Sequence, residues 1–160
     1  APVLDQNAHP IANWDAISPD NKVLSILRWS ALPGASRHHW GTDLDVYSPS
    51  AMPPEYQLQL TPAEYDEQNG MFANLTKWLS ANMAEYGFYR PYAIDLGGTA
   101  PEAWHISFAQ EAARCAKLLT LDMLNELLHK NPIEGYLTVC DQLPLIWERF
   151  IMNVCKEPRS

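Results

Sequence analysis

Imidazole and carboxylate side chains cluster in the segment Ser36–Asp45, which reads SRHHWGTDLD. Zinc favours these two ligand types, and a catalytic zinc site uses three protein ligands and leaves a fourth position to water or substrate. His38 and Asp45 are seven positions apart, so on an unbroken strand their side chains would face opposite ways. Gly41 between them gives the backbone the freedom to bend, so that both side chains can converge on one ion.

A second polar cluster, Pro101–His105, reads PEAWH and holds a carboxylate and an imidazole three positions apart. Around one tight turn Glu102 and His105 can meet, which would give a further ligand and a nearby base. A carboxylate beside a metal-activated water can take its proton, because the pKa of such a water falls to about 7. Each cluster alone is weak, since a His–Asp pair at this spacing is usually structural and Trp104 could be a core residue. Together they supply three ligands and a spare carboxylate, so the sequence predicts a water-activating metal site.

The two clusters match a known signature when they are taken together. The motifs are Ser36-x-His38-x2-Gly41-x3-Asp45 and Glu102-x-Trp104-His105. They resemble the zinc D-alanyl-D-alanine carboxypeptidases, the VanY-like and VanX-like metallopeptidases that trim peptidoglycan stem peptides or cleave D-Ala-D-Ala. The resemblance covers residues 27–108. It implies an α+β fold of the Hedgehog/D,D-peptidase type, with a small antiparallel sheet flanked by helices.

The resemblance also implies a role for each motif residue. Glu102 would be the catalytic base. The implied zinc ligands are His38, Asp45 and His105.

Asp43 departs from the pattern of the family, in which many relatives have a small residue at this position. It stands two positions before Asp45, so on a strand the two side chains share a face. Two roles remain open for Asp43. It would either support the site behind the ligands or compete with Asp45 as a ligand.

An arginine of the family is also missing from its expected place. Relatives carry it upstream of the first motif, in an SxxRS-type segment, where it helps to bind substrate or to stabilise the developing oxyanion. Nothing before Leu27 matches that segment, and Arg28 and Arg37 lie too close to the first motif. Either the chain lacks an N-terminal segment or transition-state stabilisation differs here. Loss of one such group costs about 10²–10³ in rate, so the activity of this chain alone is left open.

Four further side chains are candidate substrate contacts: Ser36, Arg37, Asp43 and Trp104. Ser36 is not expected to be a nucleophile, because a metal-activated water makes one unnecessary. For Trp104 the alternative role is to support the ligands. His39 is expected at the surface, because neighbouring residues on a strand point apart.

Helices and strands must hold the two motifs together. Apolar side chains at helical spacing predict helices over 22–32 and 71–86, the second ending at Gly87. Residues 48–62 hold four prolines and predict a long surface loop. Strands are expected over 43–47 and 88–94, and a final strand or turn over 102–108.

Beyond Ala109 the sequence predicts helices, one of them capped by Thr120 and the last covering about 143–155. These helices would form a C-terminal tail over 110–160. The expected organisation is a single α+β metallopeptidase domain over residues 1–160.

Composition excludes some partners. The chain has 19 acidic and 11 basic residues and a net charge of −8. No nucleic-acid partner is expected, because phosphate binding needs clustered Lys and Arg. No apolar run approaches the roughly 18 residues of a membrane span, so no integral membrane segment is expected. Cys115, Cys140 and Cys155 are either packing residues or one disulfide and a free thiol.

The sequence therefore predicts zinc-dependent hydrolysis of a peptide bond near a D-amino acid. The favoured activity is that of a D-alanyl-D-alanine carboxypeptidase acting on peptidoglycan stem peptides or D-Ala-D-Ala peptides. A peptidoglycan endopeptidase on the same fold and an inactive metal-bound module that binds the wall remain alternatives. A carboxypeptidase acting on mature wall would work in the periplasm or cell envelope, whereas a dipeptidase would work in the cytoplasm. The oligomeric state has no signal in the sequence.

Overall fold

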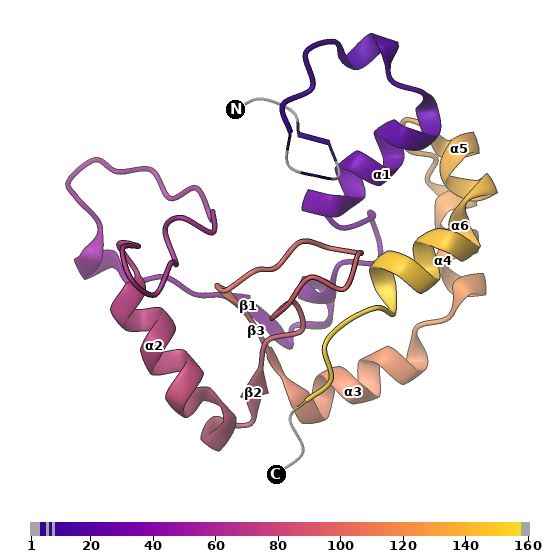
Figure 1. Ribbon diagram of the computed structural model, residues 1–160. Helices are drawn as coiled ribbons and strands as arrows, with labels where there is room; N and C mark the ends of the chain where they lie inside the picture. The colour runs from indigo at the N-terminus through magenta and orange to yellow at the C-terminus, as the bar shows by residue number, and fades with distance from the viewer. Residues whose placement is uncertain (1–3, 6, 8, 158–160) are drawn as a thin grey trace. The chain divides into compact units, whose positions relative to one another are not determined.

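The computed structural model describes residues 4, 5, 7 and 9–157. This part of the chain contains six α-helices and one three-stranded antiparallel sheet (Figure 1), which confirms the α+β class expected from the sequence. The strands are β1 (Asp43–Asp45), β2 (Phe88–Tyr89) and β3 (His105–Phe108). The α-helices are α1 (Pro19–Trp29), α2 (Ala73–Asn82), α3 (Ala109–Leu118), α4 (Leu121–Lys130), α5 (Tyr136–Asp141) and α6 (Leu143–Ile146).

The chain forms two compact units whose segments alternate along the sequence. The helical unit comprises the residues up to 36, 95–100 and 117–154. The sheet unit comprises 37–94, 101–116 and the residues from 155 onward. Both polar motifs lie in the sheet unit, except that Ser36 is the last residue of the first segment of the helical unit. A single domain over residues 1–160 stays a prediction.

Helix α1 begins where local chemistry favours a helix start. The hydroxyl of Ser18 accepts a hydrogen bond from the Asn21 N–H, and Pro19 occupies the first turn, where its missing N–H would have had no partner. Thr120 caps α4 in the same way by accepting from the Met123 N–H, as the sequence predicts. The apolar faces of α1, α4, α5 and α6 bury one core, whose members are Val23, Leu27, Leu32, Ala35, Leu124, Leu128, Val139, Leu143, Ile146 and Phe150.

The last helix is shorter than the sequence predicts. After α6 the chain forms a π-helical turn, η5 (Trp147–Ile151), and is irregular from Met152 onward. Side chains of this segment bond to the carbonyls of residues 95–100 instead. Arg149 Nε donates to the Gly97 carbonyl at 2.7 Å, and Asn153 Nδ2 donates to the Leu96 carbonyl at 2.8 Å. These two contacts tie the end of the helical segment to residues 96 and 97.

In the sheet unit β3 is the central strand and pairs with both neighbours (Figure 1). Strands β1 and β2 are shorter than expected, and β3 covers the later part of the segment expected as a strand or turn. The segment predicted as a strand over 88–94 pairs only at Phe88 and Tyr89. Pro91, which is fully buried, has no N–H to donate to a ladder, so pairing stops before it.

Helix α2 also ends close to its expected stop. It continues as the 3-10 turn η4 (Met83–Tyr86) and terminates at Gly87, whose φ of 76° lies in the left-handed region. A Cβ at this position would lie 2.9 Å from the ring of Phe108, so the turn packs directly on the end of β3. Glycine is therefore needed here for both conformation and space.

The proline-rich segment is a surface loop, as the sequence predicts, and some of its apolar side chains pack against an aromatic cluster. Tyr65, Phe72 and Trp104 are buried together, and three apolar residues of the loop pack around them: Met52, Leu58 and Leu60. The Tyr65 hydroxyl donates to the Val46 carbonyl at 2.8 Å. The loop is thus folded onto an aromatic cluster that includes Trp104 of the second motif.

Glu64 holds this loop from the inside. The residue is only 4% exposed. Its Oε1 accepts from the Tyr56 hydroxyl at 2.8 Å and the Gln59 N–H at 2.9 Å, while Oε2 accepts from the Thr61 N–H at 2.7 Å. One buried carboxylate therefore replaces the regular hydrogen bonding that the loop lacks.

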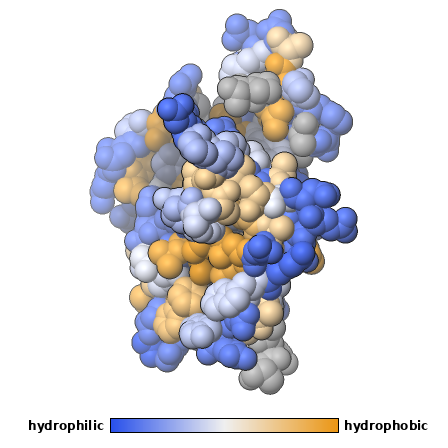
Figure 2. All heavy atoms as spheres, turned by 90° about the vertical axis from the view of Figure 1, so that its left-hand side faces the viewer, coloured by the Kyte–Doolittle hydropathy of each residue, from blue (hydrophilic) through white to orange (hydrophobic). Residues whose placement is uncertain are grey.

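The surface on the α2 side is mixed. Figure 2 shows apolar side chains gathered in patches between hydrophilic ones on this face. Such a mixture is usual for folded proteins and needs no partner to explain it. Among the described residues, no helix is both long and apolar enough to cross a membrane. The three cysteines are free and partly buried, so the disulfide alternative is not seen.

We expect the stabilisation from Glu64 to depend on pH. Burial raises the pKa of its carboxyl, but hydrogen bonds from the N–H groups of Thr61 and Gln59 and from the Tyr56 hydroxyl outweigh burial and lower the pKa below its ordinary 4.5. The contribution is therefore complete above the unfolded-state pKa and is lost as the pH falls through the lowered folded-state pKa. Glu64→Gln should lower the free energy of unfolding at neutral pH by about 1–3 kcal/mol.

Denaturant titrations of wild type and Glu64→Gln at neutral pH and in acid measure this effect. The difference between the two proteins should shrink in acid, because the wild-type carboxyl is then protonated. A difference of the same size at both pH values would contradict the assignment.

Candidate metal centre

The pairing of β1 with β3 assembles the polar side chains. Asp45 lies opposite His105, and Asp43 lies opposite Ser107. Directly opposite residues of an antiparallel pair point to the same side, as do residues two apart on one strand. The register therefore brings all four side chains to one face of the sheet.

His38 reaches this face from outside the sheet. The segment Arg37–Trp40 forms a 3-10 turn, η2, rather than a continuation of β1. Gly41 follows with φ 70°, and its N–H donates to the His38 carbonyl at 3.1 Å. The bend at Gly41 thus lets a side chain seven positions before Asp45 approach the same point.

The second motif is a tight turn at the start of β3. The His105 N–H donates to the Glu102 carbonyl at 3.4 Å, and the Glu102 N–H donates to the Tyr92 carbonyl at 2.9 Å. This backbone geometry brings Glu102 Oε2 to 3.2 Å from His105 Nδ1. The ring of Tyr92 packs edge-on against the imidazole of His105, with 5.0 Å between the ring centroids.

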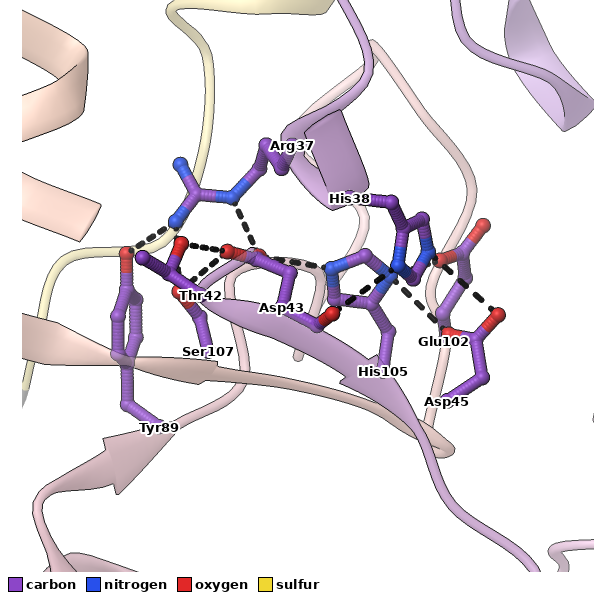
Figure 3. Close-up of polar contacts among 9 residues, drawn as sticks. All are labelled: Arg37, His38, Thr42, Asp43, Asp45, Tyr89, Glu102, His105 and Ser107. Atoms are coloured by element: carbon purple, nitrogen blue, oxygen red, sulfur yellow. Dashed lines mark hydrogen bonds and ion pairs between the residues drawn. The ribbon is translucent and has the colours of Figure 1, made fainter. Parts of the chain in front are cut away.

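Three potential ligand atoms converge beside Glu102 (Figure 3). Asp45 Oδ2 is 3.5 Å from His38 Nε2, and Asp45 Oδ1 is 3.3 Å from His105 Nδ1. The ligand atoms of His38, Asp45 and His105 lie within 4.8 Å of one another. The side chains of His38 and Asp45 are 42% and 31% exposed and that of His105 is 4% exposed, so the group opens to solvent on one side.

Hydrogen bonds select which nitrogen of each ring faces this point. His38 Nδ1 is 3.1 Å from the carbonyl oxygen of Asp43. A carbonyl only accepts, so Nδ1 carries the proton and Nε2 is left with its lone pair toward Asp45. For His105 the arrangement is reversed, because Nε2 lies 2.9 Å from Asp43 Oδ1 and Nδ1 faces Asp45 and Glu102.

Asp43 lies behind His105, and its side chain has no exposed surface. Arg37 Nε donates to Asp43 Oδ1 at 2.8 Å. Burial raises the pKa of the Asp43 carboxyl, but hydrogen bonds from His105 and Thr42 and the charge of Arg37 outweigh it and hold that pKa well below its usual range. Asp43 is therefore an ionised, buried carboxylate that contacts Nε2 of His105, whereas Asp45 and Glu102 lie at Nδ1 on the other side of the ring.

His105 is surrounded by negative charge. Burial alone would lower the pKa of its imidazole, but hydrogen bonds with Asp43, Asp45 and Glu102 outweigh burial and raise the pKa to about 10. The carboxylates of Asp45 and Glu102 thus favour a positive charge at Nδ1 of the ring. When no metal ion is bound there, a proton on the imidazole supplies this charge.

The four candidate substrate contacts lie in different surroundings. Arg37 is 6% exposed, and its guanidinium bonds to Asp43, Tyr89 and Ser107. Asp43 is buried as described, and Trp104 is 8% exposed in the aromatic core. Ser36 is partly exposed. Only Ser36 has the accessibility that a substrate contact needs, and that role for it stays a prediction.

Sequence reasoning missed the residues that support Asp43. The Thr42 hydroxyl donates to Asp43 Oδ2 at 2.6 Å, and the Ser107 hydroxyl donates to the same oxygen at 3.0 Å. Ser107 could have been found, because it stands two positions after His105 on the expected strand and shares its face. Thr42 and Tyr89 carried no comparable signal.

Comparisons with known proteins agree with the motif. The family model described as VanY, D-alanyl-D-alanine carboxypeptidase, matches residues 10–111, which include both motifs. An uncharacterized protein of Haemophilus influenzae is 30% identical over 123 residues, which cover 76% of this chain and 93% of that protein. No solved structure matches the chain.

We expect His105 to be an imidazolium at neutral pH when no metal is bound. Its stabilising contribution is then complete below its ordinary pKa of 6.5 and is lost as the pH rises through about 10. The ¹⁵N resonances of the ring, assigned by their absence in His105→Gln, should titrate near pH 10 in protein treated with chelator. Titration near 6.5 would show that the surrounding carboxylates do not act on the ring as described.

Proposed function

Because the chain belongs to the D-alanyl-D-alanine carboxypeptidase (VanY) family, we propose that it is a zinc peptidase that releases D-alanine from D-Ala-D-Ala peptides. The natural substrate would be a peptidoglycan stem peptide. In this proposal His38, Asp45 and His105 hold the metal and Glu102 is the general base.

The convergence of three ligand atoms within 4.8 Å carries this proposal. Two imidazoles and one carboxylate are a donor set that zinc accepts, with a further position left for water or substrate. The charge balance also fits a divalent cation, because His105 is held by three carboxylates and only Asp43 has an arginine beside it. His38 presents a lone pair on Nε2, since its Nδ1 donates to a carbonyl.

Bound zinc would supply Lewis-acid polarisation of the scissile carbonyl and of the attacking water. Glu102 is suited to take a proton from the attacking water and to pass it to the leaving amine. Its side chain is 19% exposed, so water can reach it, and its Oε2 lies 3.2 Å from His105 Nδ1. As the water oxygen bonds to the carbonyl carbon, Glu102 Oε2 takes the proton. It then gives that proton to the amine nitrogen when the C–N bond breaks.

The buried residues around the site would keep this geometry fixed. The imidazole of His105 is held between Asp43 and the ring of Tyr92, and Glu102 is tied by its N–H to the Tyr92 carbonyl. A base and a ligand that share one short turn need little reorganisation when substrate binds, which favours the reaction.

A non-catalytic metal-bound module that binds the wall is the second candidate. The engagement of two arginines favours it: Arg37 is buried against Asp43, and Arg28 forms an ion pair with Asp95. Neither guanidinium is free to stabilise an oxyanion, although Glu102 lies where a base is needed. Tight binding of a D-Ala-D-Ala peptide without any product would support this candidate.

The site of action follows from the substrate. Trimming mature peptidoglycan would require the periplasm or cell envelope, and cleavage of a free dipeptide would take place in the cytoplasm. An endopeptidase that cuts elsewhere in the stem peptide would be distinguished by its products from muropeptides.

Glu102→Gln tests the base. The amide cannot accept the proton, so turnover of a D-Ala-D-Ala peptide should fall by about 10²–10⁴-fold. Zinc content should stay near one ion per chain, because the three ligands are unchanged. Elemental analysis and release of D-alanine measure the two quantities on the same preparation.

His105→Ala is the matched comparison, since it should lose both zinc and activity. Full hydrolytic activity in zinc-loaded Glu102→Gln would overturn the role of Glu102. Folded wild-type protein that takes up no zinc would overturn the proposal as a whole.

A further inference from the structure

The carboxylate of Asp43 has no acceptor position left for a metal. Its Oδ1 accepts from Arg37 Nε at 2.8 Å and from His105 Nε2 at 2.9 Å. Its Oδ2 accepts from the Thr42 hydroxyl at 2.6 Å and from the Ser107 hydroxyl at 3.0 Å (Figure 3). A carboxylate offers about four lone-pair sites, and these four donors occupy them. Asp43 is therefore not a competing ligand, although it shares a strand face with Asp45.

Burial makes this contact with His105 hard to exchange. The side chain of Asp43 is fully buried and that of His105 is 4% exposed, so water cannot replace either partner. Turning the imidazole by half a rotation would put a carbon atom against Asp43 Oδ1 and leave a buried carboxylate short of a donor. A buried charged group that lacks a hydrogen-bond partner is destabilising, and more so than a neutral group in the same place. The ring is thus held with Nε2 toward Asp43.

Arg37 makes such a carboxylate possible in the core. An uncompensated buried charge is strongly unfavourable, and a paired one needs its remaining hydrogen bonds satisfied. Arg37 supplies the opposite charge and also donates to the Ser107 hydroxyl at 2.8 Å and the Tyr89 hydroxyl at 3.2 Å. The network holds Asp43 from three directions and leaves its fourth contact for His105.

We infer that Asp43 is a positioning residue for the metal centre. It fixes the imidazole of His105 so that Nδ1 meets the ion, and it does so without binding the ion itself. Carboxylates that hold a ligand histidine in this way orient the ring and raise its basicity. The inference rests on the proposed function, because it assumes that His105 binds zinc.

Glu64 offers a matched control for a test of Asp43. Both residues are carboxylates of the sheet unit that are 4% exposed and accept several hydrogen bonds. Glu64 bonds to Tyr56, Gln59 and Thr61, none of which belongs to the metal centre. Asp43→Asn and Glu64→Gln make the same chemical change, so a general loss of stability should be seen in both.

Zinc affinity, measured by competition with a chromophoric chelator, separates the two variants. Asp43→Asn should bind zinc about 10–100-fold more weakly than wild type, whereas Glu64→Gln should keep wild-type affinity. Unchanged affinity in folded Asp43→Asn, or an equal loss in both variants, would overturn the inference. Wild-type protein that binds no zinc would instead overturn the proposed function and this inference with it.

The ring nitrogens give a second measurement that needs no folded variant. In zinc-loaded wild type, long-range ¹H–¹⁵N spectra should show His105 metal-bound at Nδ1 and protonated at Nε2. His38 should show the reverse, with the proton on Nδ1. Zinc on Nε2 of His105 would overturn the inference even if Asp43→Asn failed to fold.

Discussion

The register of β1 against β3 is the constraint on which the rest of the site depends. Asp45 stands opposite His105 and Asp43 opposite Ser107, so one ladder of backbone hydrogen bonds sets two side-chain pairs at once. A slip of one residue would turn either strand over and send its polar side chains to the other face. Glu102 and His38 join from the flanking turns, and both turns are fixed by where the strands begin.

The candidate ligands could be predicted from the sequence, but the buried residues that support them could not. His38, Asp45, Glu102 and His105 were recognisable because their residue types and spacing match a metal signature. The class of fold followed from the same resemblance and from helical periodicity. Strand pairing was not predictable in detail, because β2 and β1 are too short for alternation to set their ends.

Arg37 shows why the remaining roles were out of reach. A charged residue beside the candidate ligand His38 suggested contact with substrate, yet its guanidinium is buried against partners 6, 52 and 70 positions away in the chain. Long-range pairing of this kind leaves no local pattern in the sequence. The contacts of the proline-rich loop with Tyr65, Phe72 and Trp104 were out of reach for the same reason, because they join residues far apart in the chain.

The turn from Glu102 to His105 carries the proposed base, a core aromatic residue and a proposed ligand within four residues. Trp104 anchors that turn in the aromatic cluster, while Glu102 and His105 approach each other in the candidate metal centre. Moving this motif into another protein would therefore require more than its four residues. A designer would also have to carry Tyr65 and Phe72, because Trp104 packs in the core cluster that contains these two rings.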